Sequence, residues 1–154
     1  MAHHPAHKLR RRPPFFHPVP LRARKDGWTV ERQCAFLAAL YATGSVGRAA
    51  AAVGMARRGA YRLREREGAE DFARAWDGVL TLPGTGPVAP ANIDWRKVTN
   101  RTLLQRIESG LVRPVIYRGR MVGVQRKPDN FALFRLLRRC DAVCSATDYR
   151  TGTA

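Results

Sequence analysis

Arginine and tyrosine recur at helical spacing between positions 57 and 64 of the chain. The residues are Arg57, Arg58, Tyr61 and Arg62, with Arg64 as a further candidate. In an α-helix of about 3.6 residues per turn, the first four share one side. Because an arginine can bond guanine with two donors or grip a phosphate, such a face is typical of a helix that lies in the major groove of DNA. A solvated basic face on an ordinary helical hairpin is the alternative interpretation.

A second group of candidates lies just upstream. Ser45 is placed to cap a short helix over residues 46–53, and Arg48 follows in its first turn. The free amide groups and the positive dipole end at such a helix start favour a phosphate. We therefore predict that Ser45 and Arg48 hold the DNA backbone, while the arginines of the next helix meet the bases.

The small residues of RAAAAVGMARRGAYRLRERE, positions 48–67, predict how these two helices are positioned. A bulky side chain where the helices cross would hold them apart, and Ala50 stands at the expected crossing. Gly54 then supplies a sharp turn with positive φ. Two positions fit less well, because Ala56 cannot cap the helix over about 56–66 and Gly59 lies inside it. The residues expected to face inward are Val46, Ala49, Val53, Ala60 and Leu63, with Met55 over the turn.

The remaining elements are predicted from capping residues and hydrophobic periodicity. Thr29 caps a first helix that ends at Gly44, and a fourth helix begins near Glu70. The predicted fold class is mainly α: a helix-turn-helix bundle followed by a helix, a β-hairpin and a closing helix. The later elements are a helix over 95–109, a hairpin over 112–126 with Gly119 at its turn, and a helix from Asp129 or Asn130 to about Cys140.

These elements imply five regions along the chain. The arm is expected to be disordered because it combines five prolines with many cations and has no acidic residue before Asp26. It would add nonspecific attraction for phosphate or serve as a solubilising tail. The regions are a disordered basic arm (1–27), a helix-turn-helix DNA-binding domain (28–81), a linker (82–94), a helix/β-hairpin/helix assembly region (95–141) and a flexible tail (142–154).

The net positive charge of the chain indicates an anionic partner. The 154 residues carry 28 Lys and Arg against 12 Asp and Glu, a formal charge of +16. Such an excess opposes compaction unless an anionic partner neutralises it, so double-stranded DNA is the expected partner. No apolar run is long enough to span a membrane, and no basic helix carries an apolar face that would insert. We expect a cytoplasmic protein with no membrane partner.

Cysteine and histidine give little sign of metal or redox chemistry. Cys34, Cys140 and Cys144 make an odd count without an export signal, which favours reduced thiols. Cys34 and Cys140 fall on helical apolar faces and are expected in the core. No second ligand pair stands at zinc-site spacing, and the histidines at positions 3, 4 and 7 would bind a metal only adventitiously. We predict no functional metal site and no cofactor.

Catalysis is not expected. Acidic residues are few and scattered, and no histidine lies within the part expected to be ordered. The sequence LPGTGP, 82–87, lacks the lysine and the following helix of a P-loop. No serine has a general base near it in sequence. The chain is therefore predicted not to be an enzyme.

Two sequence patterns together resemble the phage terminase small subunit-like proteins, which carry a homeodomain-like helix-turn-helix. The resemblance runs from Trp28 to Cys140. Its first part, TGSVGRAAAAVGMARRGAYRLRERE followed by FARAWDGVL, is shared by many helix-turn-helix proteins. Its second part, GLVRPVIYRGRMVGVQRKPDNFALFRLLRR, is more specific. The resemblance implies recognition of phage DNA, assembly into a homo-oligomeric ring and delivery of the DNA to a large terminase ATPase subunit.

The resemblance also implies roles for single residues. The recognition helix falls on Arg57, Arg58, Tyr61 and Arg62. The chain departs from the family pattern at Ala56 and in a connector broken by Pro83, Pro87 and Pro90. A bacterial transcriptional regulator of the same fold is therefore an alternative. So is a protein–protein adaptor that uses the hairpin and the closing helix, unless both simply complete the core. The family's hairpin falls on Val115, Tyr117, Gly119, Val122 and Gly123, and its closing helix on Asn130, Leu133, Leu136 and Leu137.

Overall fold

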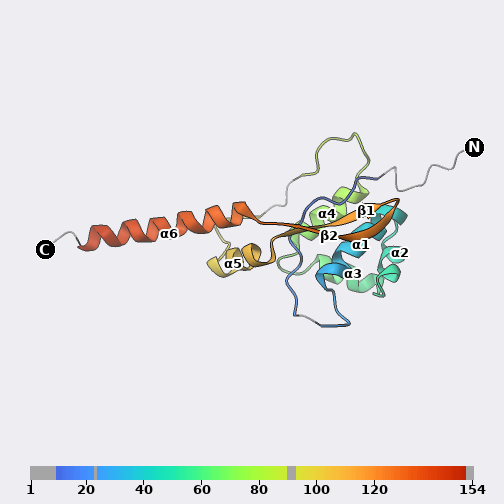
Figure 1. Cartoon of the computed structure of the whole chain (residues 1–154), viewed down its shortest axis with the longest axis horizontal. Helices are drawn as coiled ribbons and strands as arrows, with labels where there is room; N and C mark the ends of the chain where they lie inside the picture. The colour runs from blue at the N-terminus through green and yellow to red at the C-terminus, as the bar shows by residue number, and fades with distance from the viewer. Residues whose placement is uncertain (1–9, 23, 90–92, 152–154) are drawn as a thin grey trace, which may run out of the picture. The chain divides into compact units, whose positions relative to one another are not determined.

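The computed structural model describes residues 10–22, 24–89 and 93–151. Their order of elements confirms the predicted mainly helical fold, with a β-hairpin between two of the helices (Figure 1). Two compact units form, one from the residues up to Ile93 with Leu111–Arg126, the other from Asp94–Gly110 and the residues from Lys127 onward. The elements are α1 (Val30–Thr43), α2 (Val46–Ala52), α3 (Arg57–Arg64), α4 (Glu70–Leu80), α5 (Asn100–Ser109), β1 (Leu111–Tyr117), β2 (Arg120–Lys127) and α6 (Asn130–Thr151).

Hydroxyl side chains cap three of these helices. Thr29 Oγ1 accepts a hydrogen bond from the Arg32 amide at 3.2 Å, and Ser45 Oγ accepts one from the Arg48 amide at 3.4 Å. Both caps were predicted and are confirmed. The helix expected over 95–109 begins only at Asn100, because Thr99 caps it. A capping hydroxyl satisfies an amide that has no partner within the helix, so each of these residues fixes a helix start.

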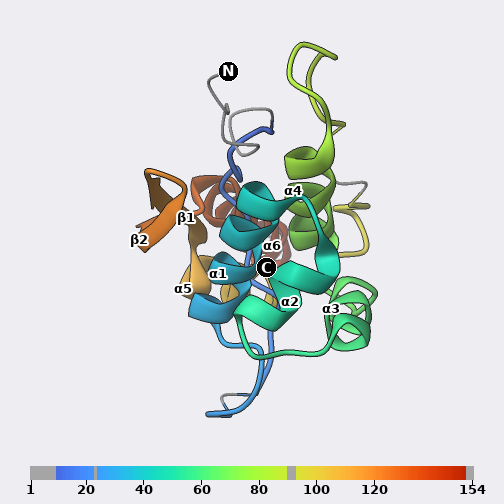
Figure 2. The same cartoon turned by 90° about the vertical axis from the view of Figure 1, so that its right-hand side faces the viewer.

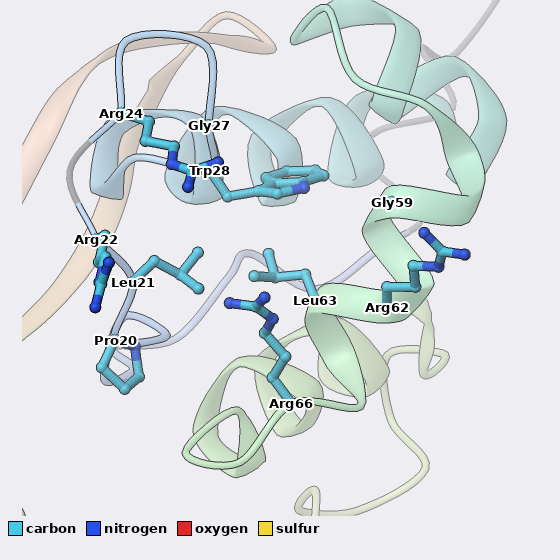
Figure 3. Close-up of a pocket in the computed structure, with 10 residues that line it drawn as sticks. All are labelled: Pro20, Leu21, Arg22, Arg24, Gly27, Trp28, Gly59, Arg62, Leu63 and Arg66. Atoms are coloured by element: carbon cyan, nitrogen blue, oxygen red, sulfur yellow. The ribbon is translucent and has the colours of Figure 1, made fainter.

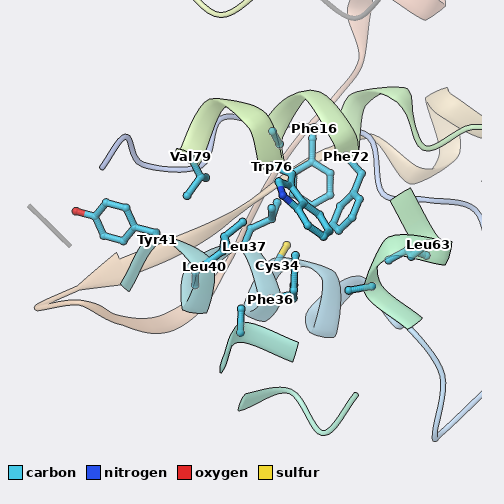
Figure 4. Packing of buried hydrophobic residues seen from close by; sticks show 14 of the residues in the cluster. Phe16, Cys34, Phe36, Leu37, Leu40, Tyr41, Leu63, Phe72, Trp76 and Val79 are labelled. Carbon is cyan, nitrogen blue, oxygen red and sulfur yellow. The ribbon is translucent and has the colours of Figure 1, made fainter. Parts of the chain in front are cut away.

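Aromatic side chains form the centre of the first unit's core (Figure 4). The ring centroids of Phe36 and Trp76 lie 4.9 Å apart, and those of Phe72 and Trp76 lie 6.1 Å apart. Phe36 and Phe72 are both fully buried, and Trp76 is 2 % exposed. Phe36 comes from α1 and the other two from α4, so the contacts of Phe36 with Trp76 and Phe72 hold α4 against α1.

Residues 13–19 lie in the part of the chain that was expected to be a disordered arm, and the structure corrects that expectation. Phe16 is 1 % exposed, and its ring lies 5.9 Å from the ring of Phe72. Its backbone exchanges two hydrogen bonds of 2.9 Å with Val112 of β1. Prolines exclude a helix here, but they are compatible with an extended segment, and its residues 16–19 are all buried. The expectation for residues 1–9 lies outside the described residues.

The arginines at the start of this segment bind the backbone of the first unit. Arg10 donates to the carbonyls of Tyr41 and Thr43 at 3.0 and 3.3 Å, at the C-terminal end of α1. A cation is favourable there because the last carbonyls of a helix carry partial negative charge. Arg11 and Arg12 also donate to backbone carbonyls. Part of the charge that suggested a phosphate-binding arm therefore stabilises the fold.

Gln33 of α1 holds both ends of the loop over residues 20–28. Its side-chain oxygen accepts from the Val19 amide at 2.8 Å, and its nitrogen donates to the carbonyls of Val19 and Trp28 at 3.2 Å each. The side chain is only 1 % exposed. One buried amide thus satisfies three backbone groups, which fixes the loop against α1.

The β-hairpin predicted with Gly119 at its turn is confirmed, and the turn has two residues. Arg118 and Gly119 have φ of 49° and 78°, which is the geometry of a type I′ turn. Val112 and Ile116 of β1 are 0 % and 7 % exposed, because alternate residues of this strand face the core. The hairpin lies against α1, on the side away from α3 in Figure 2. The hairpin therefore belongs to the first unit. The predicted assembly region 95–141 grouped it with the helices on either side, and that grouping is wrong.

The second unit consists of α5 and α6. Leu103 and Ala132 are fully buried where the two helices meet. Asp129 caps α6 through the Ala132 amide at 3.1 Å and pairs with Arg106 at 3.8 Å. The backbone of α6 continues to Thr151, so the helix end predicted near Cys140 is wrong, while the flexibility expected of residues 142–154 stays a prediction. Neither glycine nor proline interrupts this stretch, so nothing in its backbone chemistry ends the helix earlier.

Candidate nucleic-acid interface

The turn between α2 and α3 has the geometry that the sequence predicted. Gly54 has φ of 72° and donates its amide to the Ala51 carbonyl at 3.1 Å, while the Met55 amide bonds to the Ala50 carbonyl at 2.9 Å. This pair of bonds is a Schellman motif, which needs a left-handed residue at the position of Gly54. The motif ends α2 sharply and sends the chain into α3.

Small residues lie where α2 meets its neighbours, as expected. Ala49 and Ala50 of α2 and Ala60 of α3 are all fully buried, and Leu63 is 2 % exposed. Because none of the three alanines carries more than a methyl group, α2 and α3 can approach closely. Val46 and Val53 also pack against this core but remain partly exposed. The buried side of α3 is therefore fixed by Ala60 and Leu63.

The opposite side of α3 presents the four residues that the sequence singled out. Arg57, Arg58, Tyr61 and Arg62 are all exposed. At 100° per residue they cover an arc of about 140°, and Ala60 and Leu63 fall outside it. We call these four residues the exposed α3 face. It combines three guanidinium groups with one phenol on a single side of one short helix.

Contact between the Tyr61 and Trp76 rings holds the exposed α3 face against α4. The Tyr61 ring lies 5.3 Å from the Trp76 ring of α4, which leaves the tyrosine 38 % exposed. The Arg57 guanidinium lies 5.9 Å from the centre of the Tyr61 ring. Stacking of this kind holds side chains in place with little loss of their hydrogen-bonding capacity. Trp76 thus connects the exposed α3 face to the aromatic core.

Arg64 was predicted as a further member of the site, but its side chain lies against α4. Its guanidinium donates two hydrogen bonds to the Asp77 carboxylate, at 2.6 and 2.9 Å. It also lies 5.2 Å from the centre of the Trp76 ring. A bidentate arginine–carboxylate pair occupies the donors that a DNA contact would require. The structure therefore separates Arg64 from the four residues of the exposed α3 face.

Ser45 and Arg48 lie at the start of α2, as predicted. The Ser45 hydroxyl accepts from the Arg48 amide, so it serves as the helix cap, and the Arg48 side chain is exposed. Contact of these two residues with phosphate stays a prediction. Gly59, the glycine inside α3, points toward the Trp28 side chain. A Cβ atom built on it would meet Trp28 Nε1 at 3.7 Å, an ordinary contact distance.

A cleft beside α3 was not anticipated from the sequence. It has a volume of about 650 Å³ and lies between α3 and the loop over residues 20–28 (Figure 3). Four arginines line it, and we call it the arginine cleft: Arg22 and Arg24 from the loop, Arg62 from α3 and Arg66 just after it. The loop was assigned to a disordered arm, so no sequence pattern connected these arginines to α3.

The second unit has a different surface. Phe131, Phe134 and Leu137 of α6 are 53 %, 60 % and 48 % exposed. Trp95 packs against Phe131 with ring centroids 4.8 Å apart. Cys140, expected in the core, is exposed instead. Too few residues of the second unit cover α6 to bury its whole apolar side.

The cysteines and carboxylates do not form a metal centre within the described ranges, where no three His, Cys, Asp or Glu side chains come together. The histidines at positions 3, 4 and 7 lie outside those ranges. Burial raises the pKa of the Cys34 thiol to about 12. Among the described helices, none is both long and apolar enough to cross a membrane.

Comparison with protein-family models, with curated proteins and with solved structures finds no match to this chain. The resemblance to phage terminase small subunit-like proteins therefore stays a prediction from sequence patterns. We therefore infer function from the exposed α3 face, the apolar surface of α6 and the arginine cleft.

Proposed function

We propose that the chain binds double-stranded DNA through the exposed α3 face. The observation that carries this proposal is the common orientation of Arg57, Arg58, Tyr61 and Arg62 on a helix whose other side is buried. A short helix attached through a sharp turn to another helix suits the major groove, where arginine donors meet guanine acceptors. The formal charge of +16 favours the same polyanionic partner.

The roles within this interface follow from the position of each side chain. Arg58 and Arg62 are free of ion pairs among the described residues, so their donors are available for base edges. Ser45 and Arg48 would contact the phosphate backbone at the start of α2. Arg57 is held near Tyr61, which favours a contact to phosphate or sugar at the edge of the groove.

A binding measurement with matched variants tests the proposal. Arg58→Ala should weaken binding to a preferred duplex by about 1–3 kcal/mol if Arg58 contacts a base. Arg138→Ala removes the same charge from the exposed surface of α6 and should leave affinity nearly unchanged. An equal loss in both variants would mean that only net charge matters. The preferred duplex would first be selected from random sequences, with affinity measured as fluorescence anisotropy.

The biological role proposed for this binding is DNA recognition of the kind found in phage terminase small subunit-like proteins. The hairpin and the leucine-rich α6 support it through the sequence resemblance. Transcriptional regulation is the alternative role. A ring of many subunits favours packaging, whereas a dimer on half-sites one helical turn apart favours regulation. The mass of the protein–DNA complex in solution distinguishes them.

A second candidate function is protein binding through α6, because its exposed Phe131, Phe134 and Leu137 form an apolar surface on one helix. The hairpin contributes less to this proposal, since Val112 and Ile116 complete the core. Phe134→Ser combined with Leu137→Ser should reduce self-association or partner binding in sedimentation experiments. The affinity for duplex DNA per subunit should stay the same.

A further inference from the structure

We propose that the arginine cleft binds the sugar–phosphate backbone of a DNA strand that flanks the exposed α3 face. This inference rests on the DNA binding proposed above and extends it to a second, sequence-independent contact. It concerns residues that lie outside the exposed α3 face, apart from Arg62, and that the helix-turn-helix pattern does not include.

The charge of the side chains that line the cleft favours an anionic ligand. Arg22, Arg24, Arg62 and Arg66 line one cleft, and no acidic side chain lines it. Among the residues that the structure describes, none of these four guanidinium groups has an ion pair, whereas Arg64 and Arg126 do. Four cations gathered without a counter-charge repel one another, and an anionic ligand would relieve that repulsion. Arginine suits phosphate in particular, because its planar fork matches two phosphate oxygens.

The loop that forms one wall of the cleft is attached to α1, in the first unit. Gln33 holds Val19 and Trp28, so both ends of the loop that carries Arg22 and Arg24 are tied to α1. The Trp28 ring packs edge-on against Phe36 at 5.6 Å. On the other wall, Gly68 allows Pro20 to approach closely, since a Cβ atom there would come within 3.1 Å of the proline ring. The two ends of the loop and Pro20 are thus held in place without a ligand, which lowers the entropy cost of binding.

The shape of the arginine cleft and its position beside α3 suit a DNA strand. Figure 3 shows the Arg66 side chain entering the cleft from one side and the Trp28 indole closing it on the other. Leu21 and Leu63 supply apolar surface between them, which suits the sugar carbons of a strand. Arg62 belongs both to the cleft and to the exposed α3 face. A strand leaving that face therefore has a continuous basic path into the cleft.

A salt titration of the full-length chain tests this inference. The test variant is Arg22→Gln with Arg66→Gln, and the control is Arg101→Gln with Arg138→Gln, which removes the same charge from exposed positions of α5 and α6. For each protein, affinity for the selected duplex and for a scrambled duplex is measured across salt concentrations. Each phosphate contact contributes about 0.9 to the slope of log affinity against log salt concentration.

The proposal predicts that the slope of the test variant is smaller by about 2, on both duplexes alike, because phosphate contacts carry no sequence information. The control should keep the wild-type slope. Arg22→Lys with Arg66→Lys retains the charge and should restore most of the slope. Thermal melting of each variant checks that the loss does not come from unfolding.

Three outcomes would overturn the inference, and they are distinguishable. A wild-type slope in the test variant would remove the cleft from the interface and leave the exposed α3 face as the DNA site. Binding of ATP or inorganic pyrophosphate that depends on Arg22 and Arg66, together with an unchanged duplex slope, would assign the cleft to a free phosphate ligand. Failure of the wild-type chain to bind any duplex would refute the proposed function and this inference together.

Discussion

Helices α3 and α6 both mix arginine with apolar residues, but they distribute them differently. In α3 the apolar residues Ala60 and Leu63 are buried, so the exposed side is basic. In α6 the exposed side is apolar at Phe131 and Phe134, while Arg139 turns back to bond the carbonyl of Trp95 at 3.0 Å. Composition alone therefore does not decide which surface a helix presents. The arrangement of its neighbours does.

The difference follows from how much structure surrounds each helix. α3 contacts both α2 and α4, and its aromatic neighbour Trp76 is 2 % exposed. Within its own unit, α6 has α5 as its neighbouring helix. A helix with neighbours on two sides buries its apolar stripe, whereas one with a single neighbour leaves part of it exposed. We therefore propose a polyanion as the partner of α3 and an apolar protein surface as the partner of α6.

Thiol reactivity should show the largest difference between the first unit and α6. Burial raises the pKa of Cys34 from 9.0 to about 12, so at pH 8 it is almost entirely the unreactive thiol. Cys140 and Cys144 are exposed. With an aromatic disulfide reagent, two thiols should react at once. The third should react orders of magnitude more slowly, because it must wait for the core to open. Three fast thiols would contradict the packing of α1.

Truncation of phenylalanine should separate the two regions in stability. Phe72→Ala removes a fully buried ring and should lower the free energy of unfolding by about 3–5 kcal/mol. Phe134→Ala removes a ring that is 60 % exposed and should change it by less than about 0.5 kcal/mol. Denaturant titration followed by circular dichroism measures both. A large loss from Phe134→Ala would show that something covers α6 in solution.

Alanine substitution of two arginines of α3 should have opposite effects, one on DNA binding and the other on stability. Arg62→Ala should weaken DNA binding by about 1–3 kcal/mol and leave stability almost unchanged. Arg64→Ala breaks the pair with Asp77, which is partly exposed, and should cost up to about 1 kcal/mol of folding free energy with little effect on binding. Anisotropy and thermal melting on the same two variants provide the comparison. If Arg64→Ala weakened binding as much as Arg62→Ala, the boundary of the exposed α3 face would be wrong.

The smallest effect is expected at Gly59. Gly59→Ala should raise the free energy of unfolding by about 0.5–1 kcal/mol, because glycine is a poor helix residue and a methyl group there finds ordinary contact with Trp28. Contacts made by the exposed α3 face alone should not change, since Gly59 lies outside that face. Because Gly59 lines the arginine cleft, weaker DNA binding by the more stable variant would support a strand in the cleft beside Trp28, and unchanged binding would count against one.

Local signals predicted much of this structure. The caps Thr29 and Ser45, the turn at Gly54 and the hairpin turn at Gly119 each depend on a residue with a specific backbone or capping role. The exposed α3 face was also predictable, because helix geometry places residues 57, 58, 61 and 62 together once the inward positions are known. Such features need no knowledge of distant parts of the chain.

Tertiary contacts account for what the sequence did not predict. Nothing local shows that Phe16 packs on Phe72, or that Gln33 holds Val19 across 14 positions. The segment around Phe16 is rich in proline and cations, a composition that is typical of disorder when considered alone. The ion pair of Arg64 was not predicted for the same reason, because its partner Asp77 lies in another helix.

The most direct test of the central claim is a map of amide chemical shifts in the protein, with and without the selected duplex. If DNA binds through the exposed α3 face, the largest changes fall on Arg57, Arg58, Tyr61 and Arg62, while residues 130–144 of α6 change little. Changes concentrated on α6 or on the hairpin turn, with α3 unaffected, would contradict this claim.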